Sequence, residues 1–262
     1  METPLAAGEA PRTRRALRFG LVPRLLLRPR RTYGEIVALD QPSWLTPLLL
    51  LSIAALLPVL ALGHVRSAAG ALGPESLPPD FQYYTPDQQA QFMQALDSTR
   101  SPTFLYLLPG VGALAVVWLG WLITGAVAHL ASTLLGGRST SLSVLNVAAW
   151  SGLPLALRAI VRAAFILAAH RAIAGPGLSG FIATDSTGLT LFARQVLGTI
   201  DLYLIWHIIL LGLGLAALGG LTRGKVVAAV AVTEVVALLV QAIPAAILAS
   251  LAGLTIVRPF LF

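Results

Sequence analysis

The residues LASTLLGGRSTSLSVLNVAAWSGLP, numbers 130–154, decide the fold of this chain. They join two long apolar segments through a short polar turn around Gly136, Gly137 and Arg138. A loop of about eight residues cannot cross a bilayer, so the two segments must form an antiparallel helical hairpin. The glycines permit the left-handed backbone that ends a helix, and Arg138 places a positive charge beside the last carbonyl groups. We expect the other segments to pack around this hairpin.

The composition predicts an all-α integral membrane protein. Of the 262 residues, 56% are hydrophobic and 11% are charged, whereas a soluble domain has about 25% charged residues. Five apolar segments are long enough to span, at about 45–64, 104–135, 144–169, 196–220 and 226–252, and Pro154 predicts a kink in the third. The chain then divides into a basic amphipathic N-terminal segment (1–43), a five-helix transmembrane domain (44–253) and a short tail (254–262).

The N-terminal segment predicts a basic piece at the membrane interface. The net charge is +7, and 8 of the 18 basic residues precede residue 44. Arginines alternate with apolar residues there, and those expected to face lipid are Arg14, Arg15, Arg18, Arg24, Arg28, Arg30 and Arg31. Pro23 and Pro29 should divide the segment into short helices, and Thr32 with Glu35 fits a capping box that opens one of them. Anionic headgroups are the expected partners; the alternative is a topology signal with solvated charges.

The distribution of basic residues predicts an orientation. With the N-terminus in the cytoplasm, its eight arginines lie inside together with Arg138, Arg223 and Lys225, whereas Arg66, Arg100, Arg171, Arg194 and Arg258 lie outside. The positive-inside rule therefore favours five spans in the plasma membrane, with the N-terminus cytoplasmic and the C-terminus outside. We expect no nucleic-acid partner, because no aromatic-and-basic stripe accompanies the charge.

The loop between the first two spans contains a second amphipathic signal. Thr85 can cap a helix that has Pro86 at its first position, and Phe92, Met93 and Leu96 share one face of it. We expect this helix to lie over the mouth of the bundle.

Ionisable residues within the predicted spans are the candidate functional residues. Charges are costly in hydrocarbon, so these side chains should face inward and pair. Counting depth at 1.5 Å per residue predicts an outer layer in which Arg158 and Arg162 face Asp201. It also predicts an inner pair of Glu234 with His129, while His207 is a further buried polar residue. The alternative is that Arg162 extends to the headgroups and His129 lies among them.

No catalytic or metal-binding signature is present. The sequence has no cysteine, no H-E-x-x-H or G-x-S-x-G motif, no Walker A motif and no dinucleotide-binding glycine pattern. We therefore expect no enzymatic activity, cofactor or metal. Gly212, Ala216 and Gly220 recur every four residues on the fourth span, which predicts a face for close helix packing.

Short motifs in this order resemble the Yip family of multispan membrane proteins. After His129 come the residues Gly136, Gly137, Arg138, Asn146, Ser151 and Pro154, with similar runs at 28–33, 42–44 and 219–225. The resemblance covers about residues 28–250 and implies five spans without known catalysis. The family is named for interaction with Ypt/Rab GTPases; the arginine-rich, lysine-poor composition resembles a bacterial-type member, so only the architecture is carried over.

Three hypotheses for function follow. The first is a non-enzymatic, membrane-embedded interaction or membrane-organising protein, whose protein partner the sequence does not identify and for which a homo-oligomer is one option. The second is a transporter or channel component that uses Arg158, Arg162, Asp201 and Glu234 along a polar path. The third, an intramembrane enzyme, lacks any recognisable spacing of nucleophile and base.

Overall fold

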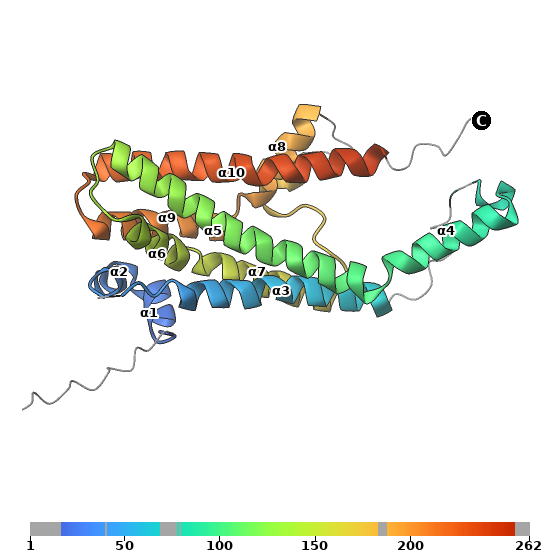
Figure 1. Cartoon of the computed structure of the whole chain (residues 1–262), viewed down its shortest axis with the longest axis horizontal. Helices are drawn as coiled ribbons and strands as arrows, with labels where there is room; N and C mark the ends of the chain where they lie inside the picture. The colour runs from blue at the N-terminus through green and yellow to red at the C-terminus, as the bar shows by residue number, and fades with distance from the viewer. Residues whose placement is uncertain (1–16, 40, 69–77, 79, 183–187, 255–262) are drawn as a thin grey trace, which may run out of the picture.

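The computed structural model describes residues 17–39, 41–68, 78, 80–182 and 188–254, with side chains up to residue 243. All regular elements in these ranges are helices, which run mostly along one axis (Figure 1). Arg14, Arg15 and most of the predicted tail lie outside the described residues. The helical fold agrees with the prediction from composition.

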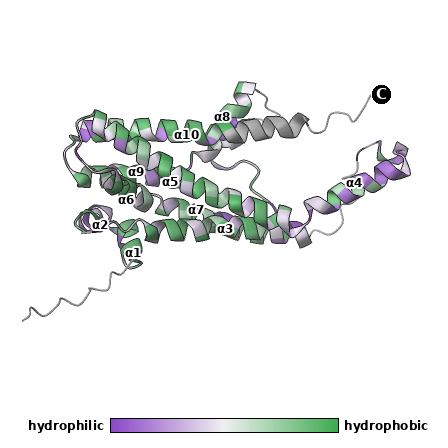
Figure 2. Cartoon of the chain, viewed as in Figure 1, coloured by the Kyte–Doolittle hydropathy of each residue, from purple (hydrophilic) through white to green (hydrophobic). Residues whose placement is uncertain are grey.

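Long apolar helices form the bundle. They are α3 (Leu45–Ala68), α5 (Leu108–Leu134, preceded by a π-helical turn at Thr103–Leu107), the consecutive pair α6 (Ser141–Ser151) and α7 (Leu153–Ala169), and α10 (Arg223–Leu254). In the described part of the chain, four such helices are long and apolar enough to cross a membrane. Hydrophobic residues cover most of their surface (Figure 2), because they face lipid and not water. The predicted kink at Pro154 corresponds to the break at Gly152 between α6 and α7.

The fourth crossing is broken, which the sequence did not predict. Helix α8 (Gly188–Thr199) and helix α9 (Leu202–Leu218) are bent by 67° relative to each other, so they replace the continuous span expected at 196–220. Helix α9 alone has 17 residues, about 25 Å of helix, slightly less than the hydrocarbon thickness of about 30 Å. Counting this bent pair as one span gives five crossings.

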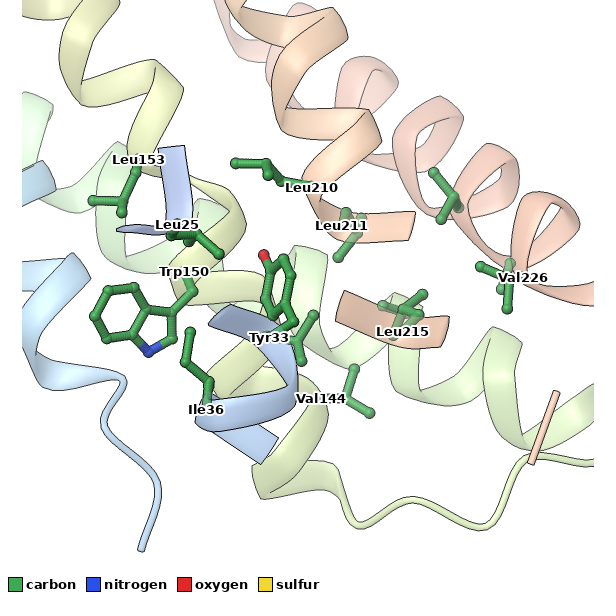
Figure 3. Close-up of a cluster of buried hydrophobic side chains, with 14 of the residues drawn as sticks. Leu25, Tyr33, Ile36, Val144, Trp150, Leu153, Leu210, Leu211, Leu215 and Val226 are labelled. Atoms are coloured by element: carbon green, nitrogen blue, oxygen red, sulfur yellow. The ribbon is translucent and has the colours of Figure 1, made fainter. Parts of the chain in front are cut away.

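The N-terminal segment packs against the bundle. It forms α1 (Leu21–Leu27) and α2 (Pro29–Val37), whose Leu25, Tyr33 and Ile36 are fully buried against α6 and α9 (Figure 3). The segment is thus divided at Arg28 as the prolines predicted, but its apolar face covers protein. The predicted capping box is wrong: α2 already begins at Pro29, and the Thr32 hydroxyl donates to the Arg28 carbonyl at 3.0 Å.

Polar side chains of α6 hold the start of α3. The Asn146 Oδ1 atom accepts a hydrogen bond from the Ser43 N–H at 3.0 Å, and the Trp150 indole donates to the Ser43 hydroxyl at 3.1 Å, all in buried positions. Next to Ser43, Trp44 stacks on Trp121, with ring centroids 5.2 Å apart. These bonds fix the register of the first span against the hairpin, because a buried polar group without a partner would be costly.

Gly214 is the position of closest approach on α9. A Cβ there would collide with the side chain of Val147 and lie 2.9 Å from Tyr33 Cε1. At Gly212, on the predicted packing face, a Cβ would meet only Val230 at 3.8 Å, and Ala216 is exposed. The close packing therefore occurs on a neighbouring face of the helix.

The loop helix α4 (Pro86–Thr99) begins as predicted, with Thr85 as its N-cap and a reciprocal capping box to Gln88. The prediction that it lies over the bundle mouth is wrong, since α4 projects away from the bundle (Figure 1). Its Phe92 packs instead against Phe81 of the 3-10 turn η2 (Phe81–Tyr83) and against Tyr84, which follows that turn. The remaining element is another 3-10 turn, η4 (Gly177–Phe181), next to α8.

Candidate functional site

A cavity of about 540 Å³ lies among α3, α5, α7, α9 and α10. Most of its wall is apolar and includes Pro58, Leu62, Val116 and Leu238. The ionisable residues that border it are Arg66, Arg158, Arg162, His207 and Glu234. A mostly apolar cavity with a few converging polar groups is the usual form of a ligand site, so we regard it as the candidate functional site.

Arg158 and Asp201 form an ion pair at the break between α8 and α9. Arg158 Nη1 lies 3.3 Å from Asp201 Oδ2 and 3.5 Å from the carbonyl of Thr199. The other carboxylate oxygen, Oδ1, caps α9 by accepting from the Leu204 N–H at 2.9 Å. Asp201 thus neutralises the charge of Arg158 and accepts a hydrogen bond from an otherwise free N–H in the first turn of α9. The structure brings together these two residues of the predicted outer layer.

Glu234 faces His207, and the predicted pair with His129 is wrong. His207 Nε2 lies 3.2 Å from Glu234 Oε1, and both side chains are more than 90% buried. His207 Nδ1 lies 2.9 Å from the Ser151 carbonyl oxygen, which can only accept, so Nδ1 carries a proton. His129 Nδ1 is buried without a hydrogen-bond partner among the described residues. The fold places His207, and not His129, opposite Glu234 on α10.

The contact of Glu234 with His207 is close but poorly aligned. Glu234 Oε1 is buried and accepts no hydrogen bond of good geometry from the part of the chain described here. The pair therefore places two buried, ionisable side chains beside the cavity.

Arg162 and Arg66 border the cavity as free cations. Both side chains are exposed, and within the described ranges neither forms an ion pair or hydrogen bond. Of the two arginines predicted to reach Asp201, Arg158 forms the ion pair, and Arg162, one turn later on α7, does not. No group of three or more His, Asp or Glu residues lies close enough to hold a metal ion in the described segments.

A second charged region, the basic end, lies where α1 and α2 meet the two short turns of the bundle (Figure 1). Its exposed basic residues are Arg18, Arg24, Arg28, Arg30, Arg31, Arg138, Arg223 and Lys225. Glu35 pairs with Arg24 and Arg31 at 3.3 and 3.5 Å. The turns also touch each other, because Lys225 Nζ donates to the Leu135 carbonyl at 2.7 Å and so caps the end of α5.

The motif residues of the hairpin have structural roles. Gly136 has a positive φ of 93°, and Gly137 donates to the Ser132 carbonyl at 2.8 Å, which closes α5. Ser151 supplies the carbonyl that orients His207, and Pro154 is at the beginning of α7, where a missing N–H costs nothing. Sequence reasoning did not assign a partner to Ser43; its place in the run Pro42–Trp44 was the available signal.

Several long apolar helices, a broken crossing and charges confined to the interior and to the ends define this chain as a multi-pass helical membrane protein. The model of the Yip1 domain matches residues 24–253, and the chain belongs to that family. The match includes α1 and α2 from Arg24 onward, in agreement with their burial against the bundle. Comparisons with curated proteins and with solved structures found no match.

Proposed function

We propose that this protein is a non-enzymatic membrane-organising protein whose basic end gathers anionic lipid headgroups. The observation that carries the proposal is the fixed position of the arginines: α2 is held by the buried Tyr33 and Ile36, while Arg28, Arg30 and Arg31 remain exposed. A cation near an anionic surface contributes about 1 kcal/mol. Because the arginines are held by a folded segment, they form a defined patch beside the headgroups.

The basic end faces the cytoplasm in this proposal, and the membrane is the plasma membrane. The positive-inside rule supports the orientation, since both short turns and the N-terminal helices carry the excess of arginine and lysine. The opposite end of the bundle carries α4 (Figure 1).

Electron paramagnetic resonance of spin-labelled lipids tests the proposal. The full-length protein is reconstituted in vesicles with labelled phosphatidylglycerol or phosphatidylcholine, and the fraction of motionally restricted label is measured. We expect a preference for phosphatidylglycerol that decreases with salt and decreases further in the variant Arg28→Gln/Arg30→Gln/Arg31→Gln. The matched control Arg100→Gln/Arg171→Gln removes arginines at the other end and should keep the preference. Equal restriction of both lipids by the parent protein would refute the proposal.

The cavity supports a second candidate, a transporter or channel component. Its specific support is the position of Arg158, His207 and Glu234 along one cavity inside the spanning region. Vesicles loaded with a pH-sensitive dye would report proton movement after a pH jump. A rate above that of empty vesicles, abolished in Glu234→Gln, would favour this candidate; a rate equal to that of empty vesicles would count against proton transport.

A further inference from the structure

We propose that the central cavity is a binding site for one anionic glycerophospholipid of the leaflet opposite the basic end, with its phosphate at Arg162 and Arg66 and an acyl chain along the apolar wall. The proposal concerns a different site from the basic end, and the two can be tested separately.

The unpaired arginines of the cavity favour an anionic ligand. Arg158 is offset by Asp201, and Glu234 faces His207. Arg66 and Arg162 have no ion-pair partner in the described ranges. A guanidinium in a spanning region needs a counter-ion or water, and its planar fork matches a phosphate group.

The two free arginines lie at the same depth. Arg66 is 21 residues after Leu45 on α3, and Arg162 is 21 residues after Ser141 on the α6–α7 segment. At 1.5 Å per residue, each is about 31 Å from the basic end of the bundle. A hydrocarbon core is about 30 Å thick, so both guanidinium groups can reach the level of the phosphates in the opposite leaflet.

The rest of the cavity suits an acyl chain. Glu234 lies 11 residues after Arg223, about 16 Å from the basic end and so about 15 Å below the arginines. This distance is about one leaflet of hydrocarbon. The wall between them is apolar and includes Val116, Val117 and Leu238. The cavity volume, about 540 Å³, is within the usual range of small-molecule sites, roughly 300–1,000 Å³.

Two glycines of α5 leave unfilled space beside the cavity. Gly112 and Gly120 border the cavity, and a Cβ at either would meet no atom within 4 Å. The space beside them is therefore unfilled by protein. A side chain at position 120 has room for its Cβ beside the cavity, so Gly120→Leu occupies part of the cavity and leaves every charge in place.

Photo-cross-linking tests the site. Full-length protein in vesicles is exposed to phosphatidylglycerol or phosphatidylcholine that carries a diazirine in one acyl chain, illuminated, digested and analysed by mass spectrometry. We expect phosphatidylglycerol adducts on the cavity-lining residues of α5 and α10 at one lipid per protein. The yield there should decrease at least tenfold in Arg66→Gln/Arg162→Gln and in Gly120→Leu, and should be unchanged in Arg171→Gln, a matched arginine that does not border the cavity.

Two outcomes would refute the lipid site. Equal labelling by both lipids would refute the anionic specificity, and adducts that persist in Gly120→Leu would refute the site inside the bundle. Gel filtration and thermal unfolding identify a variant that fails to fold; Gly120→Leu then provides the test, since it removes no charge. The variant Arg28→Gln/Arg30→Gln/Arg31→Gln should keep the cavity adducts while it loses the lipid preference measured by spin label, so failure of one proposal is distinguishable from failure of the other.

Discussion

The pair of Arg158 and Asp201 can be separated experimentally into its two roles. Asp201 both neutralises Arg158 at 3.3 Å and caps α9 through the Leu204 N–H at 2.9 Å. Asparagine caps a helix about as well as aspartate does. The change Asp201→Asn therefore removes the charge and keeps the cap, whereas Asp201→Ala removes both.

The exposed fractions of the Arg158 and Asp201 side chains determine how much stability the loss of the ion pair should cost. Removing one partner of a fully buried pair costs about 3–5 kcal/mol, because the other charge is left without compensation. Here the side chains are 35% exposed for Arg158 and 21% for Asp201, which reduces the cost to about 1–3 kcal/mol for Asp201→Asn. Loss of the cap in Asp201→Ala adds about 1 kcal/mol. For a chain of this size, each 1 kcal/mol lowers the midpoint of thermal unfolding by about 2–4 °C.

Thermal unfolding in one detergent provides the assay, with Arg158→Gln and the double variant Arg158→Gln/Asp201→Asn completing a cycle. We expect the double variant to be more stable than the sum of the single losses predicts, by about 1–2 kcal/mol, since neither charge is stranded. Strictly additive losses would refute the ion pair. Equal stability of Asp201→Asn and Asp201→Ala would refute the cap.

Three other predictions concern packing, titration and orientation. Gly214→Ala should lower stability by about 1–3 kcal/mol because its Cβ overlaps neighbouring side chains, whereas the control Gly212→Ala should raise it by up to about 1 kcal/mol; equal unfolding midpoints would contradict the packing. Burial raises the pKa of Tyr33 above its ordinary value of 10. Above pH 10 the unfolded state therefore loses the tyrosine proton while the folded state keeps it. This group leaves the free energy of unfolding unchanged below pH 10 and decreases it by about 1.4 kcal/mol per pH unit above pH 10. Tyr33→Phe should be at least as stable as the parent, since the hydroxyl has no partner in the described structure, and should show a smaller alkaline loss; an identical alkaline loss would contradict this. In intact cells an impermeant thiol reagent should label Ser76→Cys and spare Ser139→Cys; labelling of Ser139→Cys alone would reverse the orientation.

The spanning helices could be predicted because lipid imposes one simple requirement. A segment in hydrocarbon must satisfy its backbone polar groups internally, so long apolar runs imply helices. The hairpin turn at Gly136 and Gly137 followed from the same argument. The outer pair of Arg158 with Asp201 could also be anticipated, because depth along a helix depends only on residue number and rise per residue.

Lateral contacts could not be predicted in the same way. Depth does not determine which helices are neighbours. His129 was predicted as the partner of Glu234, whereas the fold places His207 of α9 beside Glu234 of α10. A helix that is apolar on all sides also carries no periodic signal for its buried face. For that reason Gly212 was selected from its spacing, although Gly214 makes the close approach. The burial of Tyr33 was hidden by the surrounding arginines, which favoured an interfacial interpretation.

The break at Asp201 connects the cavity with its charges. Helix α9 begins at Leu202 and runs toward the basic end, while α8 is bent by 67° away from its line. The bend directs α8 away from the line of α9, and α8 contacts α10 and η4. The cavity borders this break through Thr199 before it and through Leu204 and His207 after it. The helix end that the bend creates needs a cap, and a carboxylate at that position also supplies the counter-charge for Arg158. Asp201 therefore both caps the start of α9 and neutralises Arg158, while Arg162, one turn further along α7, remains available to a ligand.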